Sequence, residues 1–189
     1  MILKVACSLY WLLLASEGCL LSQELKPAPP PGIPSAAGAY YLQSSGKWIK
    51  LDPVFVDQSK IKGMNAYLQT EGLSGLSMNY VYLGISAPLQ LTERRPTFYI
   101  RDVGSPADAE LVQLTQRKDS RAAKAATTEV SVGNKAGFKP GEIRPITITA
   151  LSDGSFAIVP VGDLKPGEYL IALGSPVIGF DFGITAAKK

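Results

Sequence analysis

The sequence predicts an all-β domain, an antiparallel β-sandwich that follows an N-terminal signal segment and a proline-rich tether. Short runs of alternating apolar and polar residues recur along the chain, and this is the period of half-buried strands. Turn-forming residues separate these runs, and no stretch shows the apolar stripe of an amphipathic helix. A chain of 189 residues with 46% apolar and 19% charged residues is also long and apolar enough to bury a core.

The first 22 residues have the layout of a secretory signal peptide. Lys4 precedes the apolar run 5–15, and small residues follow before the polar Glu24. The run is too short to span a bilayer as a stable helix. We therefore expect residues 1–22 to be removed on export, which makes the mature protein periplasmic or extracellular.

Cys19 is a candidate lipidation residue. The segment 16–19 resembles the lipid-attachment signal of bacterial lipoproteins, in which an aliphatic residue and two small residues precede the cysteine. Gly18 fits this signal, whereas Ser16 is not aliphatic and Glu17 is not small. Two alternatives stay open, a soluble exported protein or one anchored through Cys19. Such an anchor is the one membrane contact that we expect.

The rest of the chain divides into a tether, one domain and a tail. Five prolines in residues 23–38 favour an extended polyproline form, so we expect a surface tether. Residues 39–185 are expected to form the sandwich, with about seven to nine strands in two sheets, and residues 186–189 a tail. The segment 39–52 fits either the first hairpin of this domain or a separate hairpin appendage.

Tyr40, Tyr41 and Trp48 are the candidate ligand-stacking residues. They flank the glycine-containing turn 44–46, and exposed Trp and Tyr side chains on paired strands form flat surfaces on which sugars stack. In the alternative interpretation, the same side chains close one end of the hydrophobic core. The exposure of Trp48 separates the two interpretations.

Several later segments supply further expected strands. Residues 78–87 carry no charge and indicate a buried central strand, whereas Phe98 and Ile100 alternate with polar neighbours as in a half-buried strand. Residues 108–121 carry Leu111, Val112 and Leu114 before a polar stretch, and they fit either a strand that runs out to a solvated end or a short helix. Three more segments are rich in strand-forming residues and border on turns, namely 128–132, 146–150 and 156–161.

The segment DLKPGEYLIAL, residues 163–173, predicts a turn that feeds a core strand. Pro166 presets the first dihedral angle of the turn, and Gly167 tolerates a positive φ after it. We expect Tyr169 and Ile171 to point into the core, with the Tyr169 hydroxyl group bonded to a backbone group.

This segment resembles the L-x-P-G-x-Y strand entry of small bacterial exported β-sandwich modules, including carboxypeptidase-regulatory-like and transthyretin-like modules. Residues 96–183 are also similar to uncharacterised exported bacterial β proteins whose last strand reads aromatic-Asp-Phe-Gly. The resemblance implies an Ig-like or transthyretin-like sandwich, and it brings no catalytic residues with it.

The amino-acid content restricts the chemistry. The chain has no histidine, which excludes a Ser-His-Asp or Cys-His arrangement. Its two cysteines, Cys7 and Cys19, both precede residue 23, so a mature chain lacks the ligands of a cysteine or histidine metal site. We therefore name no catalytic, cofactor-binding or metal-binding residue, and we expect no cofactor.

Carboxylates are the remaining route to catalysis. A hydrolase that uses only carboxylates needs two of them on either side of a cleft. The acidic pairs that are nearest in sequence are Asp52 with Asp57 and Asp102 with Asp108. All four occupy positions at which Asp commonly caps a turn, so they do not single out a catalytic pair.

The charge distribution argues against a nucleic-acid partner. The 19 basic and 16 acidic side chains give a net charge of +3 and are scattered, whereas a nucleic-acid binder usually carries a basic stripe. The densest patches, 93–95 and 116–121, are expected to be solvated. We therefore expect a non-catalytic exported envelope protein, an interaction or structural β-domain whose partner is an envelope protein or a glycan. The alternative is a glycan or small-ligand binding module, and a carboxylate-only hydrolase comes third.

Overall fold

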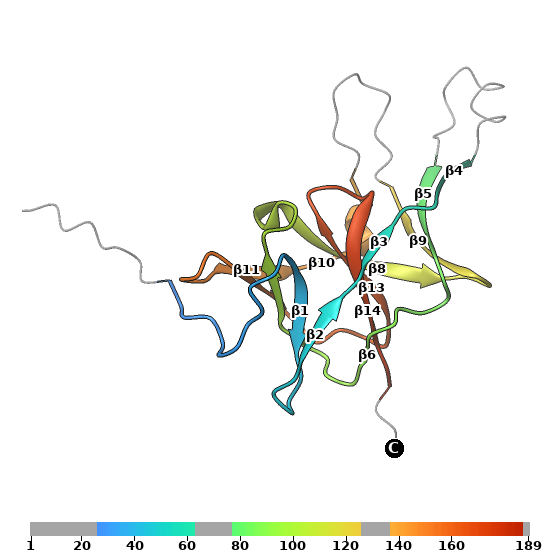
Figure 1. The fold of residues 1–189 in the computed structure, drawn as a ribbon. Coiled ribbons are helices and arrows are strands. Elements are labelled where there is room, and N and C mark those ends of the chain that lie inside the picture. Colours follow the sequence, from blue (N-terminus) through green and yellow to red (C-terminus); the bar gives the residue numbers. More distant parts are fainter. Residues whose placement is uncertain (1–25, 63–76, 126–136, 187–189) are drawn as a thin grey trace, which may run out of the picture.

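The computed structural model describes residues 26–62, 77–125 and 137–186, and these form two β-sheets (Figure 1). The five-stranded sheet contains, in spatial order, β11 (Ile146–Ala150), β12 (Phe156–Pro160), β7 (Phe98–Arg101), β1 (Gly38–Leu42) and β2 (Trp48–Leu51). The path through the nine-stranded sheet is β3 (Pro53–Phe55), β14 (Ile178–Ile184), β13 (Gly167–Leu173), β8 (Ala109–Gln116), β9 (Ser120–Lys124), β5 (Ser77–Leu83) and β4 (Gln58–Lys62).

Two short strands lie off this path. These are β10 (Ile143–Arg144), which pairs with β8, and β6 (Gln90–Leu91), which pairs with β14. The pairing of β6 with β14 is parallel and the other strand pairs are antiparallel. Two single-turn 3-10 helices, η1 (Pro106–Asp108) and η2 (Pro140–Glu142), complete the described elements. The all-β class and the two antiparallel sheets are therefore confirmed.

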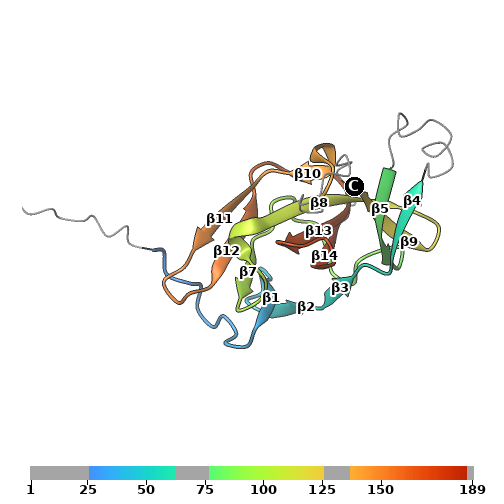
Figure 2. The same cartoon turned by 90° about the horizontal axis from the view of Figure 1, so that it is seen from above.

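At two of its five described passages between the two sheets, the chain has a single residue between consecutive strands and turns a tight corner. Leu51 ends β2 and Pro53 begins β3, while Pro145 stands between β10 and β11. Proline lacks a backbone N–H, so strand pairing breaks readily at such corners. The two sheets wrap around one interior, and their strands surround it when the molecule is seen from above (Figure 2).

The interior between the sheets holds the first core, which joins aromatic rings from both of them. Phe98 of β7 packs on Phe182 of β14 with ring centroids 4.5 Å apart, and Tyr169 of β13 stacks on the same ring at 5.6 Å. Ile100 and Ile158 fill the space beside these rings and are almost fully buried. Burial of rings of this size is the main stabilising contribution in a domain of this length.

The nine-stranded sheet encloses a second core. Its two ends, β3 and β4, follow each other directly in the chain, so the sheet curls into a nearly closed barrel. Tyr80 and Tyr82 of β5 pack inside it against Val112 of β8 and Leu170 of β13. Strands β8 and β13 therefore form a wall with a core on each face.

The shared wall explains the apolar run in DLKPGEYLIAL. Tyr169 and Ile171 point into the first core, as expected, and their neighbours Leu170 and Ala172 point into the second core. A strand that is buried on both faces requires a continuous apolar run rather than an alternating one.

The structure also bears on the other strands that the sequence predicted. Residues 109–116 form a strand, which decides between the two alternatives. The fourteen described strands exceed the expected number, partly because strands split at the corners where they change sheets. Residues 79–82 of strand β5 are buried, whereas Leu83 at its end is exposed. The strand lies next to the last strand of its sheet rather than at its centre, so the curl of the sheet covers it. The predicted strand 128–132 lies outside the described residues.

The described part of the proline-rich segment lies on the domain surface. The Ser152 N–H, in the β11–β12 turn, donates to the Pro27 carbonyl at 2.9 Å, and Gly32 lies beside Trp48 of β2. These contacts link opposite edges of the five-stranded sheet, so the segment 27–37 crosses its outer face. We call this segment the strap. Its residues Pro29, Pro30, Ile33 and Pro34 are half-buried.

Candidate functional site

Three charged side chains meet at one end of the second core, and we call them the ion cluster. Arg121 comes from β9, Glu168 from β13 and Asp181 from β14, with exposed fractions of 2%, 4% and 3%. Arg121 forms an ion pair with Asp181 through Nη1, and the same nitrogen lies 3.6 Å from Glu168 Oε2. The ion cluster brings together two carboxylates that are 13 residues apart in sequence on adjacent strands.

Two members of the ion cluster, Arg121 and Glu168, also fasten the loop that follows β5. Arg121 donates from Nε to the Gly84 carbonyl at 3.0 Å and from Nη2 to the Leu83 carbonyl at 2.9 Å. Glu168 accepts from the Ala87 N–H at 2.7 Å and from Gln90 Nε2 at 3.1 Å. Buried charges are tolerated when they are paired and hydrogen-bonded in this way, so these carboxylates serve the fold.

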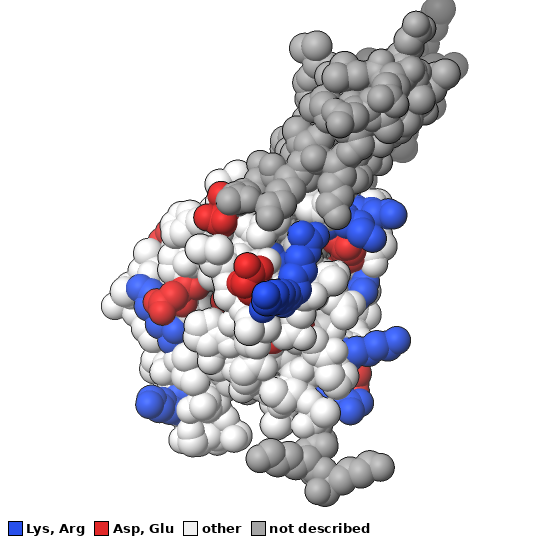
Figure 3. All heavy atoms as spheres, turned by 90° about the vertical axis from the view of Figure 1, so that its right-hand side faces the viewer, with Lys and Arg blue, Asp and Glu red and all other residues white. Residues whose placement is uncertain are grey.

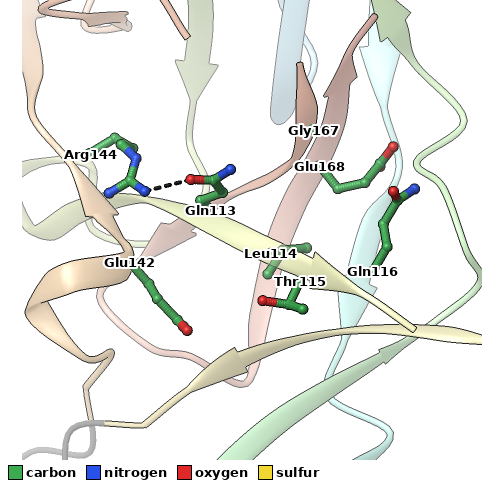
Figure 4. Close-up of a pocket in the computed structure, with 8 residues that line it drawn as sticks. All are labelled: Gln113, Leu114, Thr115, Gln116, Glu142, Arg144, Gly167 and Glu168. Carbon is green, nitrogen blue, oxygen red and sulfur yellow. Dashed lines mark hydrogen bonds between the residues drawn. The ribbon is translucent and has the colours of Figure 1, made fainter. Parts of the chain in front are cut away.

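A polar groove of about 410 Å³ opens where β8 leaves β13 to pair with β9 (Figure 4). Arg144 and Gln113 stand on one side and Gln116 on the other. The lining residues are Gln113, Leu114, Thr115, Gln116, Glu142, Arg144, Gly167 and Glu168. Two amides, a hydroxyl group, a guanidinium and two carboxylates give the groove both hydrogen-bond donors and acceptors.

The side chains of the groove are held in place before any ligand arrives. Arg144 donates from Nη2 to the Gln113 side-chain oxygen and from Nη1 to the Gly141 carbonyl at 3.0 Å. Gln116 Nε2 donates to the Ile85 carbonyl at 3.0 Å. Preorganised polar groups favour binding, because less conformational entropy is lost when a ligand is fixed.

Tyr169 ends just beneath this groove. Its hydroxyl group donates to the Lys165 carbonyl at 2.8 Å, which confirms the predicted bond to the backbone. Burial raises the pKa of Tyr169, while the charge of Arg144 and the Lys165 bond lower it in part. The phenol therefore stays protonated at neutral pH and acts as a structural donor.

The three candidate stacking residues do not share one exposed surface. Tyr40 and Tyr41 are buried, with exposed fractions of 3% and 7%. Trp48 is half-buried and meets Tyr99 edge to face, with ring centroids 5.3 Å apart. Tyr40 and Trp48 lie on the outer face beneath the strap, whereas Tyr41 points into the first core against Phe98.

Tyr41 also has an acidic neighbour at the edge of the first core. Its hydroxyl group donates to Glu93 Oε2 at 2.8 Å. Burial, together with the hydrogen bond and negative charge of Glu93, raises the pKa of Tyr41 to about 12. This phenol is therefore not a general base at neutral pH.

The sequence-adjacent aspartates occupy exposed turns and strand ends, as expected. Asp52, Asp57, Asp102 and Asp108 are all exposed, and Asp108 accepts a hydrogen bond from the Ser105 hydroxyl at 2.7 Å at the start of η1. In the described parts of the chain, no group of three or more Asp, Glu, His or Cys side chains is placed to hold a metal ion. The candidate lipidation residue Cys19 lies outside the described residues.

The ion cluster was not expected from the sequence. The prediction that the patch 116–121 is solvated is wrong for Arg121, which is buried because the sheet curls over it. The sequence contains two indications of a buried charge: Glu168 borders the apolar run YLIAL, and Asp181 lies within GFDFG. A charged residue inside an apolar strand usually has a buried partner.

Comparisons with protein-family models, with curated proteins and with solved structures find no match to this chain. No helix of the described segments is both long enough and apolar enough to span a bilayer. Basic and acidic side chains are interspersed on the face shown in Figure 3, so that face does not carry a continuous basic stripe.

Proposed function

We propose that this chain is a non-catalytic exported envelope protein, an interaction or structural β-domain whose partner is an envelope protein or a glycan. The observation that carries the proposal is the ion cluster. Its two converging carboxylates are buried and already engaged, Asp181 with Arg121 and Glu168 with Arg121, Ala87 and Gln90, so they stabilise the fold. The polar groove beside it is open and equipped for hydrogen bonding.

Export is the part of this proposal that rests on the amino-terminal sequence. The full chain should be expressed with its leader in a bacterial host that exports proteins, and the intact mass should be measured after fractionation. We expect the loss of residues 1–22 and recovery outside the cytoplasm. A product that begins at a lipid-modified Cys19 would establish a membrane anchor, and a cytoplasmic product that keeps Met1 would overturn export.

Glycan binding is the second candidate, and the composition of the polar groove favours it. Sugars are bound through networks of amide, hydroxyl and charged groups, all of which line this groove. Purified peptidoglycan sacculi are the probe, and co-sedimentation of the exported protein is the measurement. Arg144→Met should reduce co-sedimentation at least about fivefold, which corresponds to the loss of one charge-assisted hydrogen bond.

Lys118→Met is the matched control, because it removes the same charge from an exposed position in the turn after β8. If the parent binds sacculi and only Arg144→Met is impaired, the glycan candidate is supported. If the parent does not bind sacculi, that candidate fails and an envelope protein remains the proposed partner.

We also propose that the half of the molecule around the first core is a sandwich of the Ig-like or transthyretin-like kind. The resemblance of residues 163–173 to exported modules supports this proposal, as does the packing of two antiparallel sheets around one interior. A crystal structure compared with both kinds of module tests it through strand order and sheet angle.

A further inference from the structure

Strand β11 is an edge of the five-stranded sheet. It pairs with β12, and no other described strand pairs with its second edge (Figure 2). The exposure of side chains in β11 agrees with a position at the edge of the sheet. Ile158 of β12 is 1% exposed, whereas its register partner Ile148 of β11 is only half-buried. The first core is therefore open to solvent along β11.

The hydrogen bonds at both ends of β11 define which of its backbone groups face outward. Val161 N–H donates to the Pro145 carbonyl at 2.9 Å, and Leu151 N–H donates to the Ser155 carbonyl at 2.8 Å. In an antiparallel ladder, every second residue bonds to the same neighbour. The odd-numbered residues of β11 therefore face β12, and the N–H and C=O groups of Ile146, Ile148 and Ala150 point away from the sheet.

This edge lacks the devices by which proteins usually protect an exposed strand. The sequence of β11 is Ile-Thr-Ile-Thr-Ala, with four residues of high β-propensity and no charge, proline or glycine. Natural edge strands are protected by lysine, proline, bulges or a covering segment. An unprotected edge of this kind is a template for another strand.

We propose that β11 pairs with β11 of a second copy of this chain, in antiparallel orientation about a two-fold axis through Ile148. Such an axis sets Ile146 of one copy opposite Ala150 of the other and forms about six hydrogen bonds from the outward-facing groups. The two five-stranded sheets then become one continuous sheet across the dimer.

Self-complementarity is the reason to assign a second copy rather than another partner. The sequence of β11 is almost the same in either direction from Ile148. The strand can therefore pair in antiparallel orientation with an identical copy of itself. Thr147 of one copy faces Thr149 of the other, and Thr–Thr pairs are favourable across strands.

Sedimentation equilibrium of the exported protein tests the proposal. We expect dimers with half-dissociation at about 10–100 µM, because a short strand pair buries little surface. The double variant Thr147→Lys/Thr149→Lys places like charges opposite each other on the outer face and should weaken the dimer at least about tenfold. The control Ser44→Lys/Ser45→Lys adds the same charge at the exposed β1–β2 turn and should leave the dimer unchanged.

A second variant tests the position of the contact without weakening it. Thr147 and Thr149 of the two copies form a non-hydrogen-bonded pair, whose Cα separation of about 4.5 Å suits a disulfide. Thr147→Cys/Thr149→Cys should therefore form intermolecular disulfides in air. The proposal is overturned by a parent that stays monomeric at about 1 mM, by a Lys variant of parental melting temperature that still forms dimers, or by Cys chains that do not cross-link.

Discussion

The same tyrosine arrangement begins two core strands of the molecule. Tyr169 donates to the carbonyl of Lys165, and Tyr40 donates to the carbonyl of Ala36, both at 2.8 Å and both four residues back. Each tyrosine follows a glycine by two residues, and these glycines, Gly167 and Gly38, have φ values of +154° and +156°. The hydroxyl group thus secures the turn that starts the strand.

Truncation of Tyr169 should therefore destabilise the domain, and two substitutions separate the contribution of the ring from that of the hydroxyl group. Tyr169→Ala removes a ring that is 1% exposed and should cost about 3–5 kcal/mol of unfolding free energy. Tyr169→Phe keeps the ring and should cost about 1 kcal/mol, the contribution of one hydrogen bond. Urea denaturation measures both values. Parental stability of Tyr169→Ala together with a loss of ligand binding would show instead that the ring belongs to a binding surface.

Gly167 should resist substitution because of its backbone conformation. Its φ of +154° is one that residues with a side chain rarely adopt, and an added Cβ would lie 3.4 Å from Gln113 Nε2. We expect Gly167→Val to cost about 1–3 kcal/mol in the same denaturation experiment. Gly162→Val is the control, since Gly162 has open space around its Cβ position and no positive φ. Equal costs at the two positions would contradict the backbone explanation.

Removal of Arg121 should be among the most destabilising polar substitutions. Arg121→Met leaves Glu168 and Asp181 buried without a compensating charge, which typically costs about 3–5 kcal/mol. The triple variant Arg121→Met/Glu168→Gln/Asp181→Asn removes the unbalanced charges and should regain part of that loss. Denaturation of both variants measures the difference, and a triple variant less stable than Arg121→Met would refute the charge-balance argument.

At the scale of elements, the sequence predicted that the strap lies at the surface but not which parts of the domain it contacts. The five prolines predicted an extended surface tether, and the described residues 26–37 form no strand, contain a turn at residues 31–32 and are exposed or half-buried. The prolines could not show that this segment lies on the domain, because its contacts at Ser152 and Trp48 are remote in sequence. Tyr40 is buried because of the same contacts. Its aromatic character alone could therefore not show whether the ring is covered by the chain or exposed for ligand stacking.

Trp48 can report on the strap directly. The chain has two tryptophans, Trp11 in the predicted signal and Trp48, so a processed chain fluoresces from Trp48 alone. Gly32 has a φ of +71°, and its Cβ position is 3.6 Å from Trp48 Nε1. Gly32→Val should strain the strap by about 1–2 kcal/mol and increase acrylamide quenching of Trp48.

Gly84→Val is the matched control for the strap experiment. Gly84 also has a positive φ, +83°, but it lies in the loop after β5, and its Cβ position meets its nearest neighbours at an ordinary contact distance of 3.8 Å. It should be destabilised by a similar amount without a change in Trp48 quenching in the folded state. Unchanged quenching in Gly32→Val would mean that the strap does not shield Trp48.

For the whole molecule, local patterns in the sequence sufficed for the fold class but not for the second core. Alternation at Phe98 and Ile100, and the turn before Tyr169, identified strands of the first core. The second core depends on the curl that brings β5 over β8, and such a curl has no local signature. The ion cluster depends on the same curl, which explains why Arg121 was expected to be solvated.

The shared wall predicts that the two cores unfold together. Strands β8 and β13 bury one face in each core, so loss of either core exposes the wall of the other. Leu170→Ala, on the second-core face of β13, should cost about 2–5 kcal/mol. In urea, Trp48 fluorescence reports on the five-stranded sheet and far-ultraviolet circular dichroism on all strands, and both midpoints should fall together. Ile171→Ala, one residue further on and facing the first core, should behave in the same way. If Leu170→Ala shifts the dichroism midpoint but leaves the Trp48 midpoint in place, the cores are independent and the wall does not couple them.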